Sequence, residues 1–124
     1  MKVYLRKLFK HDITHEVSVT EAIIEEFFDN KRNDLVFVRD GQENGTQYKV
    51  CINKSRDARF GGEFKAIYRE DNLKEGDILA IKQLPDGRYS LSIIYENSPL
   101  YGQIDLIFEG KERHAISDEI VINS

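Results

Sequence analysis

The sequence contains one cysteine, no tryptophan and two prolines among 124 residues. Cys51 on its own excludes an intramolecular disulfide and a cysteine-rich zinc site, and a lone cysteine is more typical of a reducing compartment. No segment approaches the roughly 18 apolar residues that cross a membrane, and residues 1–7 carry charge where a signal peptide requires an apolar stretch. We therefore expect a cytoplasmic protein that has no membrane partner.

Common enzyme motifs are missing as well. The sequence has no G-x-S-x-G nucleophile motif, no phosphate-binding loop ending in GK(S/T), and no G-x-G-x-x-G. His11 and His15 are four residues apart, but an extended segment does not bring such a pair onto one face, and no HExxH motif supports them. We expect neither a cofactor nor a metal site.

A metal-dependent nuclease is the enzyme class that requires the closest test. Restriction nucleases place an acid before a (D/E)-x-K tripeptide, and such tripeptides begin at Asp29, Glu63 and Glu109. In a chain this rich in acids and lysines, about two would arise by chance, so the pattern is weak without structural context. Glu63 falls at the start of an expected helix, whereas catalysis needs acids that converge on Mg²⁺. We expect no catalytic residues.

The hydrophobic fraction of 40% and the charged fraction of 32% are ordinary for one globular domain, but the net charge of −4 hides a polarised distribution. Residues 1–10 and residues 49–69 each carry a net charge of +4, which leaves −12 for the rest of the chain. Because charges are screened over about 8 Å at physiological salt, a local basic face can still attract a polyanion.

Hydrophobic periodicity predicts a mainly β domain with two short helices, in the α+β class. Ser18 and Glu21 match a capping box, so we expect Ser18 to begin a helix whose apolar stripe is core. A second helix is expected near residues 64–71. Residues 53–62 are expected to form an exposed loop, and the Gly-Gly pair at its end indicates a bend or a close backbone approach. Seven strands are expected, including residues 3–9, 34–39, 48–52, 78–81, 89–93 and 104–108.

The two basic segments contain residue types that read base edges. In the second segment, asparagine pairs with adenine, arginine with guanine, and aspartate accepts from cytosine, while lysine and serine suit phosphates. Its candidates are Lys49, Asn53, Lys54, Ser55, Arg56, Asp57 and Arg59. The candidates of the first segment are Arg6, Lys7, Lys10, His11 and Asp12. These are the predicted binding residues.

The run from Phe64 to Ile81 contains N-L-K-E-G-D at residues 72–77 and is followed by the strand at 89–93. It resembles the end of the DNA-binding pseudobarrel fold, which plant auxin-response-factor-type domains share with the recognition domains of EcoRII-type and BfiI-type restriction endonucleases. The order of strands, helices and basic segments resembles that family over nearly the whole chain. The plant domains usually carry a tryptophan near the second helix, so the bacterial branch is the more similar one.

The resemblance implies a seven-stranded open pseudobarrel over residues 1–124 that binds double-stranded DNA in the major groove. In the family, two arms grip the groove like a wrench, and these arms correspond to Lys7–Asp12 and Asn53–Arg59 here. The resemblance also implies a non-catalytic recognition domain of a restriction endonuclease, with a nuclease domain fused after Ser124. The alternative is a barrel that binds a protein or a small ligand through its acidic surface.

Overall fold

The fold is built on one curved sheet of eight strands, seen in a computed structural model that describes residues 2–14, 16–40, 42, 45–54, 58–108 and 113–118. Within these ranges the strands are β1 (Lys2–Lys7), β2 (Ser18–Val19), β3 (Leu35–Arg39), β4 (Gln47–Lys54), β5 (Ala58–Gly62), β6 (Ile78–Gln83), β7 (Tyr89–Ile94) and β8 (His114–Asp118). The helices are α1 (Lys10–Thr14), α2 (Glu21–Glu26), α3 (Phe64–Asp71) and α4 (Tyr101–Asp105), with a 3₁₀ turn, η1 (Leu106–Phe108).

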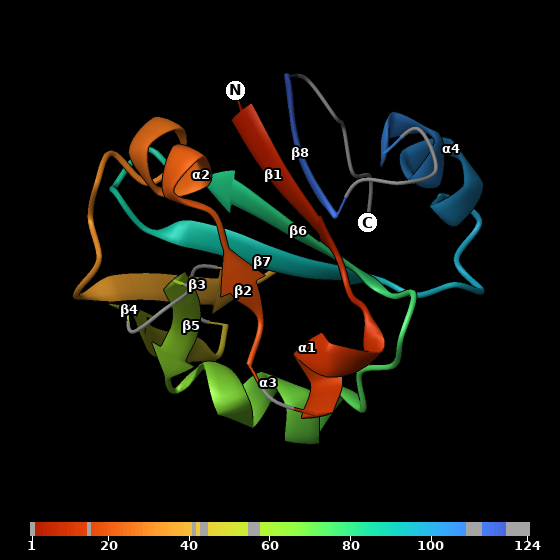
Figure 1. The fold of residues 1–124 in the computed structure, drawn as a ribbon, viewed down its shortest axis with the longest axis horizontal. Helices are drawn as coiled ribbons and strands as arrows, with labels where there is room; N and C mark the ends of the chain where they lie inside the picture. The colour runs from red at the N-terminus through yellow and green to blue at the C-terminus, as the bar shows by residue number, and fades with distance from the viewer. Residues whose placement is uncertain are drawn as a thin grey trace.

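The strands follow the order β2-β5-β4-β3-β7-β6-β1-β8 and curl into a nearly closed barrel (Figure 1). Every neighbouring pair is antiparallel except β3 and β7, which are parallel. Helix α2 lies near one end of the barrel, while α3 and α1 lie across another side of it (Figure 1). The mainly β prediction is confirmed, although the sheet has one strand more than expected and the helices are more numerous.

Aromatic rings fill the interior of the barrel. The apolar stripe predicted around Ile23 and Ile24 is buried, and Phe27 and Phe28 at the end of α2 are completely buried. The Phe28 ring lies 5.1 Å from that of Tyr89 and 5.9 Å from that of Phe60, measured between centroids. Such tilted and edge-on ring pairs fill the space between curved strands without leaving voids.

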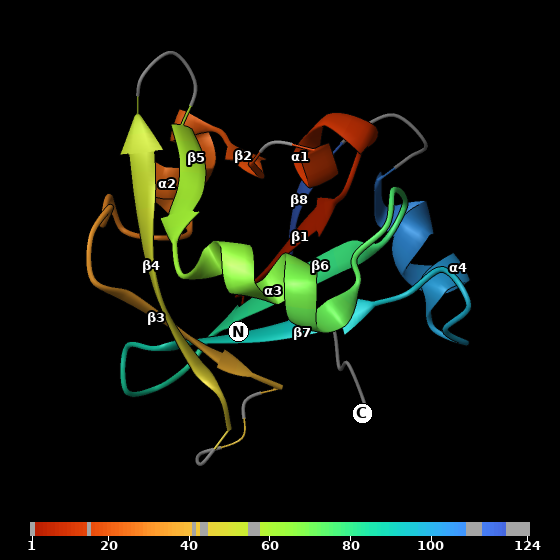
Figure 2. The same ribbon diagram turned by 90° about the horizontal axis from the view of Figure 1, so that it is seen from below.

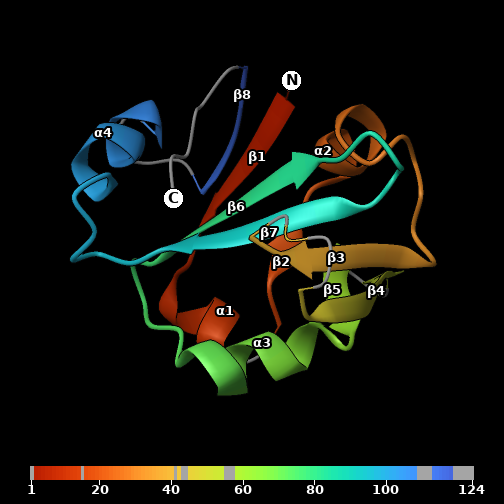
Figure 3. The same ribbon diagram turned by 180° about the vertical axis from the view of Figure 1, so that it is seen from behind.

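A second, smaller core lies on the outer face of β1 and β6. Tyr4 faces the interior of the barrel, whereas Val3 and Leu5 face outward and pack with Ile104 and Phe108 of α4 and η1. Figure 3 shows α4 beside β1 and β8, outside the sheet. The side chains of Val3, Tyr4 and Leu5 are therefore all buried, because the barrel interior covers one face of β1 and α4 covers the other.

Three local expectations were wrong. Residues 104–108 belong to α4 and η1 instead of a strand, and Ile104 and Phe108 are buried while Leu106 is 79% exposed. Residues 58–62 form β5 instead of a loop, since Phe60 supplies a core ring. The helix that was expected to begin at Ser18 begins at Glu21, with the Thr20 hydroxyl accepting a hydrogen bond from the Ile23 amide.

Candidate nucleic-acid interface

The two basic segments approach each other on one side of the molecule. The N arm (Arg6, Lys7, Lys10, His11 and Asp12) spans the end of β1 and most of α1, and the C arm (Asn53 to Arg59, with Lys49) surrounds the junction of β4 and β5. Figure 2 shows α1 and the junction ends of β4 and β5 on the same side, with β2 between them. Strand β2, which follows α1 in the chain, pairs with β5 and so connects the N-arm side to the C arm.

Two of the five N-arm side chains are inside the protein. Arg6 is 0% exposed and Asp12 is 1% exposed, and Arg6 Nη2 lies 2.6 Å from Asp12 Oδ1. The other carboxylate oxygen of Asp12 accepts a hydrogen bond from the Phe9 amide at 2.8 Å. These two side chains therefore form a buried ion pair at the base of α1 and present no polar atom to the surface.

Lys7 is directed away from α1. Its ammonium lies 2.6 Å from Asp105 Oδ1 of α4, and this hydrogen bond raises the pKa of Lys7 above its ordinary value. The pair joins the end of β1 to the helix that covers its outer face. Lys10 and His11 on α1 are exposed, so they are the N-arm residues whose side chains reach solvent fully.

In the C arm, Asn53 and Arg59 face each other across the ladder between β4 and β5. Asn53 is exposed, and its side chain lies over Gly61, where an added Cβ would come within 2.3 Å of Asn53 Nδ2. Arg59 is half-buried and stands opposite Ser18 of β2. The Gly-Gly sequence thus permits the close backbone approach that was expected, but within a strand.

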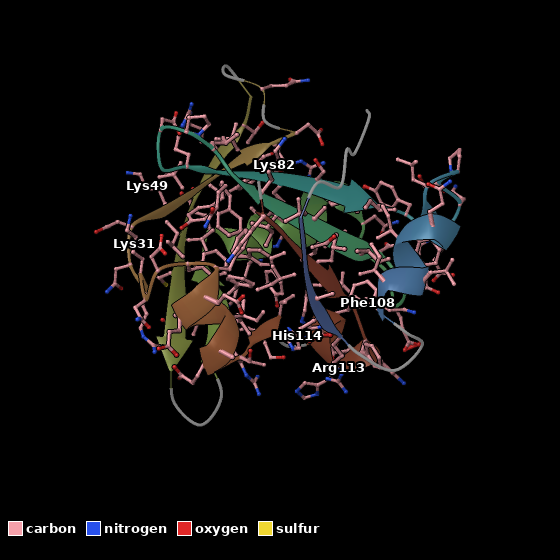
Figure 4. All side chains as sticks on the ribbon, turned by 90° about the horizontal axis from the view of Figure 1, so that it is seen from above. Lys31, Lys49, Lys82, Phe108, Arg113 and His114 are labelled. Atoms are coloured by element: carbon pink, nitrogen blue, oxygen red, sulfur yellow. The ribbon has the colours of Figure 1, made fainter. Side chains whose placement is uncertain are left out.

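The remaining C-arm candidates divide by position. Lys54 is the last residue of β4, and Ser55, Arg56 and Asp57 lie outside the described residues. Lys49 is exposed but precedes Lys54 by five residues on the same strand, a distance of about 17 Å. Figure 4 shows Lys49 with Lys31 on one flank, away from Arg113 and His114. Lys49 therefore does not belong to the tip of the arm.

The contacts of two residues near the arms were not predicted from the sequence. Arg113 precedes β8, its backbone oxygen accepts a hydrogen bond from the Lys7 amide at 2.9 Å, and its guanidinium carbon lies 4.3 Å from the centre of the Phe9 ring. It therefore adds an exposed cation beside the N arm. Ser18 hydrogen-bonds Arg6 instead of capping a helix. No local pattern predicts either contact, because strand pairing and packing create them, and the capping-box pattern at Ser18 indicated a different role.

Of the acids considered for metal catalysis, Glu109 lies outside the described residues, and Glu63 has a structural partner. Glu63 Oε1 accepts a hydrogen bond from the Lys49 amide at 2.7 Å, which fixes the turn before α3. Across the ranges that the structure describes, no three histidine, cysteine, aspartate or glutamate side chains are placed to hold a metal ion. None of the helices in those ranges has both the length and the apolar character needed to cross a membrane.

No known protein family and no curated protein sequence matches this chain. Among solved structures, the chain is similar to the N-terminal domain of LlaJI.R1 from Helicobacter pylori, with a TM-score of 0.78 and 26% sequence identity. The alignment covers 96% of this chain and 99% of the other. The similarity therefore extends over nearly the whole chain.

Proposed function

We propose that this chain binds double-stranded DNA sequence-specifically in the major groove through its two arms, and that it is the recognition part of a restriction-modification protein. The observation that carries the proposal is the placement of two separate basic segments on one side of a barrel, with β2 between them. The similar domain of LlaJI.R1 comes from a restriction-modification protein, which supports the same role.

The contacts divide between holding the backbone and reading bases. Lys10 and Arg113 on the N-arm side, and Lys54 on the C-arm side, suit phosphates because a cation serves any sequence there. His11 is assigned to the phosphates as well, because its ring N–H can donate a hydrogen bond to a phosphate oxygen. Asn53, Arg56 and Arg59 are assigned to base edges, with Ser55 and Asp57 between them as further contacts. Arg6, Lys7 and Asp12 are assigned to positioning the N arm, since their charged groups are engaged within the protein.

We further propose that the chain has no catalytic activity of its own and acts with a nuclease domain elsewhere in the same protein. Duplex DNA incubated with the chain and Mg²⁺ is expected to stay intact. Glu63→Ala is the control, because Glu63 begins the tripeptide that most resembles a nuclease motif and instead holds the Lys49 amide. Cutting that disappears in Glu63→Ala would refute this part of the proposal.

The binding proposal is tested by selecting bound sequences from random duplexes and then measuring affinity for the selected site. Specific binding should exceed binding to scrambled duplex by at least about a thousandfold and should weaken steeply with salt. Failure to bind any duplex at low salt would refute it. That result would favour a barrel that binds a protein or a small ligand.

For the alternative, a binding site for a small ligand, the structure has a cavity of about 490 Å³ lined by Asn72, Lys74, Asp77, Tyr95, Glu96 and Asn97. Asp77 is its buried acid, and its two carboxylate oxygens already accept the amides of Lys74 at 2.9 Å and Glu96 at 3.3 Å. These bonds hold the turn before β6, so Asp77 has a structural task that requires no ligand. The arms therefore remain the better supported site.

A further inference from the structure

We propose that the buried Arg6–Asp12 pair, together with Ser18, sets the distance and orientation between the two arms, so that these three residues act as positioning residues for specific binding. The inference rests on the proposed function for its DNA readout. Its structural part, the fixed geometry between the arms, is testable without DNA.

Arg6 is the centre of the arrangement and joins three segments. Its Nη2 atom donates to Asp12 Oδ1 at 2.6 Å and to Ser18 Oγ at 3.0 Å, and its Nε donates to the Ser18 backbone oxygen at 3.0 Å. Nη1 donates to the backbone oxygen of Lys7. One guanidinium therefore holds the end of β1, helix α1 and strand β2 in one rigid contact.

Each of these segments leads to an arm. Asp12 fixes α1, because its second oxygen accepts the Phe9 amide at 2.8 Å and its own amide donates to the Phe9 backbone oxygen at 2.9 Å. Ser18 pairs with Arg59 at the start of β5, and the Phe60 amide donates to the Val17 backbone oxygen at 3.0 Å. A movement of Arg6 would thus change the position of Lys10 relative to Arg59.

The chemistry of the pair favours positioning over stability. Burying two charges costs solvation energy that the ion pair only partly returns, so apolar residues of similar size often stabilise a protein as well or better. The pair instead fixes the orientation of its partners, because a planar guanidinium donates hydrogen bonds only along its fixed N–H directions. Two neighbours of Arg6 on β1 have other partners and do not join the arms. Lys7 binds Asp105, and Tyr4 binds His114.

The first test measures the geometry between the arms directly. Nitroxide labels on Lys10→Cys and Asn53→Cys, in a Cys51→Ser background, report the distance between α1 and the C arm by double electron–electron resonance. We expect one narrow distance distribution in the labelled protein with the native pair. In the labelled Asp12→Asn variant the distribution should be at least about twofold broader. Tyr4→Phe is the matched control, because it removes a hydrogen bond between β1 and β8 that joins neither α1 nor β2, and its distribution should stay narrow.

A second variant keeps the test decisive if Asp12→Asn fails to fold. Arg6→Met with Asp12→Leu replaces the pair by apolar side chains of similar size and should keep the circular dichroism spectrum and the unfolding midpoint close to those of the wild type. Its arm-to-arm distribution should nevertheless broaden. A folded variant of either kind with an unchanged distribution would overturn the proposal.

The second test asks whether this geometry matters for DNA. Affinity for the selected site should fall about tenfold or more in Asp12→Asn, the loss expected when one base pair is no longer read. Affinity for scrambled duplex at low salt should stay the same or rise slightly, since the substitution removes a negative charge. A positioning role would be contradicted if the affinities for the selected site and for scrambled duplex fell by the same factor, and if this factor matched the decrease in the fraction of folded protein.

The two proposals fail in different ways. If the wild type binds no duplex while Asp12→Asn still broadens the distance distribution, the proposed function is wrong and the Arg6 linkage stands. If the wild type binds its site and Asp12→Asn binds equally well with a narrow distribution, the linkage is wrong and the proposed function stands.

Discussion

At the scale of single residues, the type of cation in each arm decides what it can contribute to recognition. The arginine fork matches the O6 and N7 atoms of guanine, whereas a lysine ammonium is a point charge that serves any phosphate. The C arm contains both types within six residues, with Lys54 at the end of β4 and Arg59 in β5. Base reading and backbone holding are therefore separable by substitution.

We expect at least one of Arg56→Ala and Arg59→Ala to cost about 1–3 kcal/mol on the preferred site and to relax preference at one base pair. Lys54→Ala should weaken binding to all sequences alike and lower the salt slope by about one. The measurement is the affinity for the preferred site and its single-base variants over a range of salt concentrations. If neither arginine variant changes the ratio between these duplexes, the C arm does not read bases.

Gly62 is the residue at which backbone conformation constrains the C-arm hairpin. Its φ is +66°, and an added Cβ would lie 2.8 Å from the backbone oxygen of Lys49. Gly62→Ala is expected to destabilise the fold by about 2–4 kcal/mol, the cost of a left-handed residue plus a backbone clash. Urea unfolding measures this change.

Gly87 provides the matched control for that substitution. Its φ is +90°, but no atom of the residues that the structure describes lies within 4 Å of an added Cβ, so Gly87→Ala should cost only about 1–2 kcal/mol. If Gly62→Ala and Gly87→Ala lowered the free energy of unfolding equally, the approach of the Lys49 backbone to Gly62 would not be tight in solution.

At the scale of elements, sequence patterns succeeded where local periodicity and burial agree. The stripe of Ile23, Ile24, Phe27 and Phe28 was predicted as core and is buried. Residues 104–108 were misassigned because a segment of four apolar residues and one aspartate is too short to show a clear period. The burial of Ile104 and Phe108 follows the four-residue spacing of a helix.

The capping box shows why a correct local pattern can still fail. Ser18 and Glu21 have the required spacing, but the Ser18 hydroxyl accepts a hydrogen bond from Arg6 and its backbone pairs with β5. Partners that lie 12 and 41 residues away in sequence therefore outweigh the local preference, and Thr20 caps the helix instead. For the same reason, the charge count could select the arms but could not show that Arg6 and Asp12 lie inside the protein.

The proposed two-arm interface predicts that neither arm is dispensable for DNA binding. Charge reversal of the N-arm side by Lys10→Glu with Arg113→Glu, or of the C arm by Lys54→Glu with Arg56→Glu, should each reduce affinity for the preferred site by about a hundredfold or more and lower the salt slope by about two. Lys7 is left out because its ammonium holds Asp105. Binding titrations at several salt concentrations measure both quantities.

Lys31→Glu with Lys82→Glu is the matched control, because it makes the same change in net charge at exposed lysines elsewhere on the surface (Figure 4). This variant should bind within about threefold of the wild type, since charges far from the interface are screened. A two-arm grip is contradicted if one arm variant binds like the control, even if the other arm still binds DNA.

At the scale of the whole molecule, a side-chain contact links the edge strand β8 to the interior of the barrel. The Tyr4 hydroxyl lies 2.6 Å from His114 Nδ1, which joins β8 to the buried face of β1. Burial, with a smaller contribution from Arg6, lowers the pKa of His114 from 6.5 to about 4. A neutral imidazole can accept the hydrogen bond from Tyr4, and a protonated one cannot.

This pKa shift predicts that the protein loses stability as the pH falls from about 6.5 to about 4. In that window the unfolded chain binds a proton at His114 and the native protein does not, so the free energy of unfolding decreases with falling pH. Below about 4 both states are protonated and the loss from this group is complete. Since His114 is half-buried, solvent screening reduces the loss between pH 7 and 5 to about 1 kcal/mol.

Urea unfolding of the wild type and of His114→Gln at pH 7, 6 and 5 tests this prediction. Glutamine keeps an acceptor for Tyr4 but does not titrate, so the variant should lose about 1 kcal/mol less than the wild type over this range. Carboxylates titrate in both proteins, and their contribution cancels in the difference. Identical pH profiles would show that His114 takes up its proton equally well in the folded and unfolded states, and that the β8 contact does not depend on a neutral imidazole.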